Sequence, residues 1–65
     1  MAWFFRVVQL EDGYWQCRFG LHVYDAHEAL LDAVEHCKAL ASEFRPSIVL
    51  AHPRGASIQT VATFD

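Results

Sequence analysis

The 65-residue sequence has few cysteines, few basic residues and no long apolar run. Two cysteines are too few for the disulfide scaffold of many small secreted domains. Five basic against eight acidic residues give a net charge of -3, the wrong sign for a protein that coats phosphate backbones. The sequence also lacks the run of about 18 apolar residues that a membrane-spanning helix needs, and it lacks the features of a signal peptide. We therefore expect a cytoplasmic protein with reduced thiols and no membrane partner.

Hydrophobic residues, by contrast, make up 54% of the chain. This fraction is too high for intrinsic disorder, and the length predicts a single domain over residues 1–65. A domain of this size buries only about 60% of the surface that its unfolded chain exposes. Disulfides, a metal or a second copy of the chain commonly supplement such a small core. We therefore expect part of the apolar surface to be buried between molecules.

The first third of the sequence predicts a β-hairpin. Residues 3–10 are rich in aromatic and β-branched types, residues 14–19 alternate apolar with polar side chains, and a Glu-Asp-Gly turn separates them. A three-residue loop with Gly13 in a left-handed conformation places Val7 opposite Cys17. We prefer this register because it separates the charged side chains from the apolar set, whereas the one-residue slip of a two-residue loop mixes them.

In this register the outer face of the hairpin combines apolar side chains with two arginines. Its members are Phe4, Arg6, Val8, Leu10, Tyr14 and Arg18. An apolar patch rimmed by charge is typical of an interface, so we expect these residues to form a homodimer or to bind another protein. Single-stranded nucleic acid is a lesser alternative, because RNA-binding sheets stack bases on aromatic side chains. The small number of basic residues weighs against it.

The middle of the sequence predicts an amphipathic helix over residues 26–45. Apolar side chains recur at helical spacing from Leu30 to Phe44. Asp25 and Glu28 have the spacing of a helix N-cap residue and its partner at position N3, the third residue of the helix. We expect the apolar side of this helix to pack against a sheet.

Two further strands complete the predicted fold, over residues 47–52 and 57–64, with a Pro-Arg-Gly turn between them. The expected fold class is α+β. We predict a two-layer β-β-α-β-β arrangement, in which the single helix packs on one face of an antiparallel or mixed four-stranded sheet.

The four histidines and two cysteines do not have the spacing of a known chemical site. CxxC, HxH and HExxH patterns are absent from the sequence. Cys17 and Cys37 fall on predicted core faces, where a thiol is inert, and we expect His27 and His36 on the exposed surface of the helix. We therefore predict no catalytic residue, no cofactor, no metal site and no enzyme activity.

The order of these features resembles a known family. The matching segments are Val7-Val8, Asp12-Gly13-Tyr14-Trp15, Asp25-Ala26-His27-Glu28-Ala29, Val49-Leu50-Ala51-His52 and Gly55. They resemble the short bacterial family catalogued as domain of unknown function 2188. This resemblance implies a β-β-α-β-β fold and a bacterial origin, but no activity and no site residues.

Two weaker likenesses suggest another function. The hairpin and the acidic start of the helix are similar to HicB-type antitoxins, and the size and acidity are similar to phage proteins that inhibit host enzymes. Both imply an antitoxin or inhibitor that binds a basic partner through its acidic helix side. That side comprises Glu28, Asp32 and Glu35.

Overall fold

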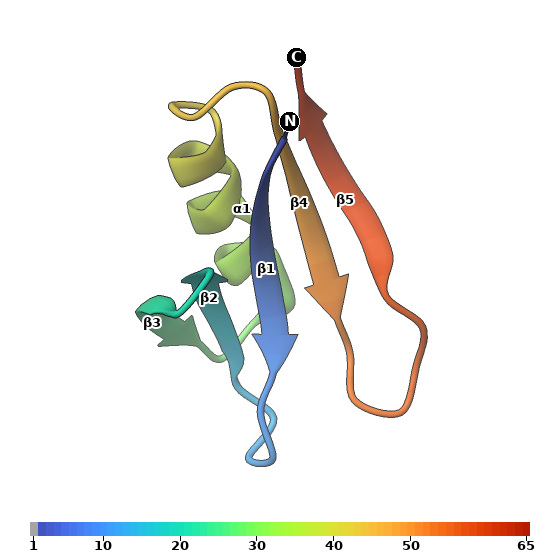
Figure 1. Cartoon of the computed structure of the whole chain (residues 1–65). Coiled ribbons are helices and arrows are strands. Elements are labelled where there is room, and N and C mark those ends of the chain that lie inside the picture. Colours follow the sequence, from blue (N-terminus) through green and yellow to red (C-terminus); the bar gives the residue numbers. More distant parts are fainter. Residues whose placement is uncertain (1) are drawn as a thin grey trace.

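The computed structural model describes residues 2–65, which form five strands and one helix (Figure 1). The elements are β1 (Trp3–Gln9), β2 (Trp15–Phe19), β3 (His22–His27), α1 (Leu30–Ala41), β4 (Ser47–His52) and β5 (Gln59–Phe64). They build one sheet of order β3-β2-β1-β4-β5, in which β1 and β4 are parallel and the other neighbours antiparallel. The predicted α+β class and mixed sheet are confirmed. The predicted count of four strands is wrong.

The additional strand is β3, which follows β2 after a tight turn. Gly20 takes a left-handed conformation there, with φ 59°, and the chain reverses so that Asp25 pairs with Cys17. Asp25 is therefore a strand residue and not a helix cap. The helix begins at Leu30, and the side chain of its N-cap residue, Ala29, makes no capping hydrogen bond. The predicted helix was thus four residues too long at its start.

At its other end, α1 stops at Ala41, also four residues earlier than predicted. The backbone N–H groups of Glu43 and Phe44 donate to the carbonyls of Leu40 and Ala41, so the chain turns instead of continuing the helix. The buried hydroxyl of Ser47 donates to the Ala41 carbonyl over 2.8 Å. This hydrogen bond fixes the start of β4 to the end of α1.

The β1–β2 hairpin has the predicted register. Val7 lies opposite Cys17, and the backbone N–H of Leu10 donates to the carbonyl of Tyr14 over 2.7 Å. Gly13 is left-handed, with φ 91°, as the three-residue loop requires. Odd-numbered residues of both strands therefore face α1, and even-numbered residues face away from it.

The core lies between the sheet and α1. Its buried members are Phe5, Val7, Cys17, Ala33, Cys37, Ala41 and Val49. The helix supplies alanine and cysteine, whose small side chains let it lie close to the strands. Aromatic rings from Trp3, Phe5, Phe19 and Phe44 close one end of the core, with the Phe5 and Phe19 centroids 4.7 Å apart. Core formation thus uses one face of the sheet.

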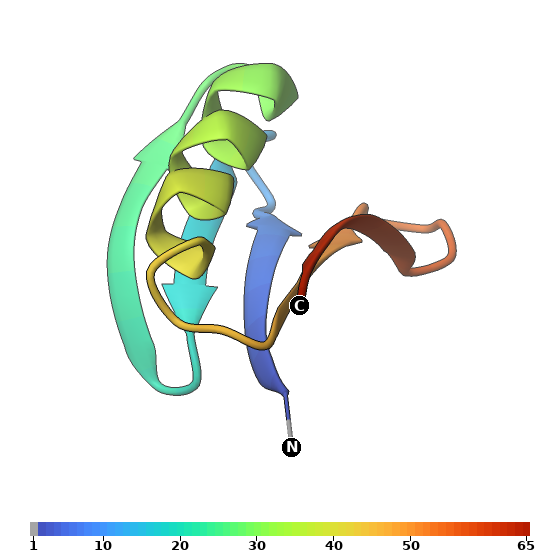
Figure 2. The same ribbon diagram turned by 90° about the horizontal axis from the view of Figure 1, so that it is seen from above.

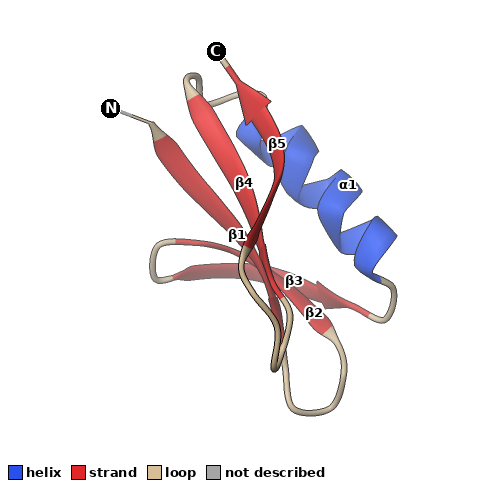
Figure 3. Cartoon of the chain, turned by 90° about the vertical axis from the view of Figure 1, so that its right-hand side faces the viewer, coloured by secondary structure: helices blue, strands red, loops and turns tan. Residues whose placement is uncertain are grey.

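The helix covers this one face, and the opposite face of the sheet has no second layer from residues 2–65 (Figures 2 and 3). The loop between β4 and β5 lies away from α1 (Figure 2), whereas Ala62 and Phe64 near the end of β5 pack against the core. Within the described chain no helix is both long and apolar enough to span a membrane.

Candidate functional site

The sheet face that α1 leaves uncovered, called the open face below, is formed by alternate residues of the three central strands. These residues are Phe4, Arg6 and Val8 on β1, Gln16 and Arg18 on β2, and Ile48, Leu50 and His52 on β4. Their immediate neighbours, such as Phe5, Val7 and Val49, are buried under the helix. Phe4 is 46% exposed, and Ile48 and Leu50 are half-buried. An apolar surface with two arginines therefore lies across the middle of the sheet.

Four of the six residues predicted as an interface lie together on this face: Phe4, Arg6, Val8 and Arg18. Leu10 and Tyr14 lie beyond the strand ends, beside the hairpin loop. Sequence reasoning missed the contribution of β4. Residues 47–52 include no Asp, Glu, Lys or Arg that would mark one side of the strand as the outer side. The parallel pairing of β4 with β1 also joins segments that are far apart in the sequence.

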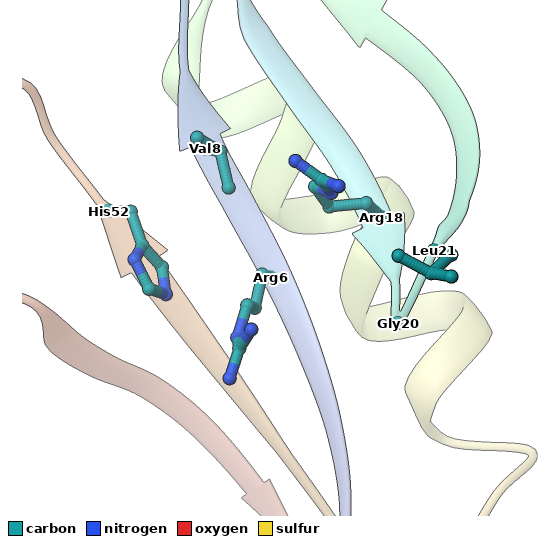
Figure 4. A pocket seen from close by; sticks show the side chains of 6 residues that line it. All are labelled: Arg6, Val8, Arg18, Gly20, Leu21 and His52. Atoms are coloured by element: carbon teal, nitrogen blue, oxygen red, sulfur yellow. The ribbon is translucent and has the colours of Figure 1, made fainter.

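A hollow of about 500 Å³ lies on the open face (Figure 4). It is lined by Arg6, Val8, Arg18, Gly20, Leu21 and His52. The Nε2 atom of His52 is buried and lacks a hydrogen-bond partner within the described chain. Burial, and then the positive charges of Arg6 and Arg18, hold the pKa of His52 below its ordinary value. The hollow therefore favours the neutral imidazole while it carries two permanent cations.

Charge is distributed unevenly over the two sides of the sheet. In the described strands the one acidic residue is Asp25, which faces α1. The open face thus has arginines without carboxylates, although the chain is acidic overall. Asp32 and Glu35 are exposed on α1, whereas Glu28 is exposed in the loop before the helix and does not belong to it as predicted.

On the helix side of the sheet, five side chains with sulfur, nitrogen or oxygen donors come together. They are Cys17 on β2, Asp25 and His27 on β3, and His36 and Cys37 on α1, and they are called the Cys/His/Asp cluster below. The prediction that His27 and His36 lie on an exposed helix surface is wrong. His27 is a strand residue, and both imidazoles are half-buried and within hydrogen-bond distance of Asp25.

The distances within this cluster are short. The Oδ1 atom of Asp25 lies 3.0 Å from His27 Nε2 and 3.0 Å from His36 Nδ1. Those two nitrogens are 3.4 Å apart. The donor atoms of Cys17, Asp25 and His36 all lie within 4.8 Å of one another. Sequence spacing did not reveal the cluster, because β3 was not recognised as a strand and its pairing with β2 brings these residues together.

The two buried thiols of the cluster are unequal. A hydrogen bond with Cys37 lowers the pKa of Cys17, although burial and the Asp25 carboxylate act in the opposite direction. The same hydrogen bond, burial and nearby negative charge raise the pKa of Cys37. Cys17 is therefore the thiol that loses its proton first.

Comparisons of the chain with family models, with curated proteins and with solved structures found no match. The resemblances to the domain of unknown function 2188 and to HicB-type antitoxins stay predictions. The open face and the Cys/His/Asp cluster are the two features from which a function can be inferred.

Proposed function

We propose that the chain is a small cytoplasmic protein-interaction module, bacterial or phage in origin, that forms a homodimer through its open face. The observation that carries this proposal is the apolar surface of Phe4, Val8, Ile48 and Leu50 across the middle of a sheet that has a helix on one face only. Apolar patches rimmed by charge are typical of interfaces. A second copy of the chain supplies the missing layer.

The size of the chain supports the same occupant. A stable interface of standard size buries about 800 Å² on each partner. The accessible surface of the chain is 4248 Å², so such an interface takes about a fifth of it. Burial of Phe4, Ile48 and Leu50 adds apolar contact area that the core of a 65-residue domain cannot provide alone.

Face-to-face packing has a distinctive electrostatic consequence. Arg6 lies on the central strand, so a two-fold axis through the open face places Arg6 and Arg18 near the same residues of the second copy. Salt screens this repulsion. The homodimer is therefore expected to become tighter between about 0.05 and 0.5 M sodium chloride, whereas binding of an acidic partner or of nucleic acid to the same arginines becomes weaker.

Sedimentation equilibrium over a range of concentrations and salt tests the homodimer. We expect Leu50→Asp to be monomeric, because the substitution puts a carboxylate in the middle of the contact. The matched control is Leu31→Asp, since Leu31 is 75% exposed on α1 and lies on the other side of the sheet. A wild-type chain that stays monomeric at high concentration and high salt contradicts self-association. Circular dichroism verifies that both variants are folded.

A second candidate function is the binding of a basic partner through the acidic helix side. It is supported by the exposure of Glu28, Asp32 and Glu35, of which Glu35 has Lys38 as a neighbour at 3.9 Å. This function predicts a neighbouring gene for a small basic protein. Binding of that gene product should be lost in the double variant Asp32→Lys, Glu35→Lys and kept in Leu50→Asp, the opposite of the pattern expected for the dimer.

A further inference from the structure

The Cys/His/Asp cluster has donor types and spacings that fit a transition-metal ion. In tetrahedral zinc sites nitrogen ligands lie at about 2.0–2.1 Å, which separates two such nitrogens by about 3.4 Å. His27 Nε2 and His36 Nδ1 are 3.4 Å apart, and each is 3.0 Å from Asp25 Oδ1. Three donors thus already have the mutual spacing of three corners of a coordination tetrahedron.

The fourth corner is a sulfur atom. Cys17 Sγ lies within 4.8 Å of the donors of Asp25 and His36, and a bound thiolate and imidazole are about 3.6 Å apart. A shift of about 1 Å brings the sulfur to ligand spacing from Asp25 and His36, and His27, which lies outside that group of three, must approach the sulfur as well. Hydrogen bonding of two imidazoles to Asp25 accounts for the three polar groups and core packing accounts for the burial of Cys17; what distinguishes the cluster is that the sulfur lies close to the donors of Asp25 and His36.

Charge balance selects which thiol coordinates. One thiolate and one carboxylate neutralise a divalent cation, and two neutral imidazoles complete four ligands without leaving net charge in a half-buried site. A second thiolate would leave a net negative charge. Cys37, the second buried thiol of the cluster, belongs to the same core as Cys17 and stays outside the ligand set, where neighbouring groups commonly tune a metal site.

We propose that Cys17, Asp25, His27 and His36 bind a zinc ion, with Cys37 as a buried neighbour outside the ligand set. The ligands come from β2, β3 and α1, so the ion ties the edge strand β3 to the helix. The N-terminus of α1 has no side-chain cap, and the metal supplies an attachment in the same region. The site lies across the sheet from the open face and does not depend on dimer formation.

Zinc titration of the reduced, metal-free chain against a chromophoric chelator tests this site. We expect one ion per chain in the wild type and a loss of affinity of more than about 100-fold in His36→Gln, because loss of an outer-shell group alone costs about 10–100-fold. Cys37→Ala, which keeps all four ligands and removes a buried sulfur from the same core, should fall within that smaller range. The control is His22→Gln, which removes an exposed histidine from β3, the strand that carries Asp25 and His27, and should bind zinc as the wild type does.

Cobalt substitution reports on Cys17 without mutation of a core residue. The cobalt-loaded chain should show a thiolate-to-metal charge-transfer band and the intense visible bands of a tetrahedral ion. Absence of zinc binding at equimolar metal overturns the proposal, as do equal affinities of wild type and His36→Gln. A cobalt spectrum without the thiolate band shows adventitious binding by surface histidines and also overturns it. Circular dichroism of the metal-free variants separates loss of a ligand from loss of the fold.

Discussion

Arg6 and Arg18 lie directly opposite each other on β1 and β2, and both project from the open face. Like charges at opposed positions of a sheet destabilise the pair, whereas favourable cross-strand pairs contribute about 0.2–1 kcal/mol. The described strands offer no carboxylate on this face to offset the repulsion. The repulsion between these two guanidinium groups is therefore a cost to the stability of the monomer.

Replacement of one of these arginines by a carboxylate should stabilise the monomer. In Arg18→Glu the new carboxylate faces Arg6, and the free energy of unfolding should rise by about 0.5 to 1 kcal/mol at low salt. Urea unfolding at a protein concentration at which the chain is monomeric measures this effect without a contribution from dimer formation. Arg54→Glu, in the exposed turn before β5, is the control and should change the free energy of unfolding little.

The same substitution tests the geometry of the dimer. If open faces pack against each other, Arg18→Glu places two carboxylates and two arginines around the two-fold axis, where the wild type has four arginines. Salt should then weaken its self-association instead of strengthening it, as sedimentation equilibrium at low and high salt will show. An unchanged sign of the salt dependence would place the contact elsewhere on the sheet.

The start of α1 offers a second prediction. Ala29 occupies the N-cap with extended backbone angles and no side-chain hydrogen bond, so Ala29→Ser should stabilise the fold by about 1 kcal/mol. The matched control is Ala39→Ser at an exposed position inside the helix, where serine lowers the helix propensity and should destabilise by about 0.5 kcal/mol. Thermal unfolding of the two variants must give shifts of opposite sign. A destabilised Ala29→Ser would mean that the helix starts elsewhere.

The hairpin could be predicted from the sequence because its signals are local. The Asp-Gly turn, the alternation in β2 and the separation of charge together define the pairing of Val7 with Cys17, and the structure has that register. The apolar stripe of the helix was equally clear. Its ends were not, because the spacing of Asp25 and Glu28 also occurs where a strand precedes a helix.

The remaining features depend on contacts between distant segments. The parallel pairing of β1 with β4 adds Ile48, Leu50 and His52 to the open face, and no local pattern encodes it. The Cys/His/Asp cluster likewise requires β3 to pair with β2 beneath α1. Its residues are separated by intervals that match no metal-binding motif, so spacing alone argued against a site that the fold assembles.

The last prediction concerns pH and His52. Its pKa is lowered in the folded chain by burial and by Arg6 and Arg18. In the unfolded chain the His52 imidazole has its ordinary pKa of about 6.5, so as the pH falls the unfolded chain is protonated at His52 before the folded chain is. The contribution of His52 to stability is therefore present above pH about 6.5 and is lost as the pH falls toward the lower pKa of the folded chain. His52→Gln should remove this part of the pH dependence, whereas His22→Gln, at an exposed position, should keep it.

Nuclear magnetic resonance titration of the His52 imidazole measures the cause directly. Its pKa should lie below 6.5 in the wild type and rise in Arg6→Gln, which removes one of the two facing cations. Protonation adds a third positive charge to the centre of the open face, so the homodimer should also weaken at acidic pH, and less in His52→Gln. A His52 pKa that does not respond to Arg6→Gln would show that the arginine does not act on the imidazole across the hollow.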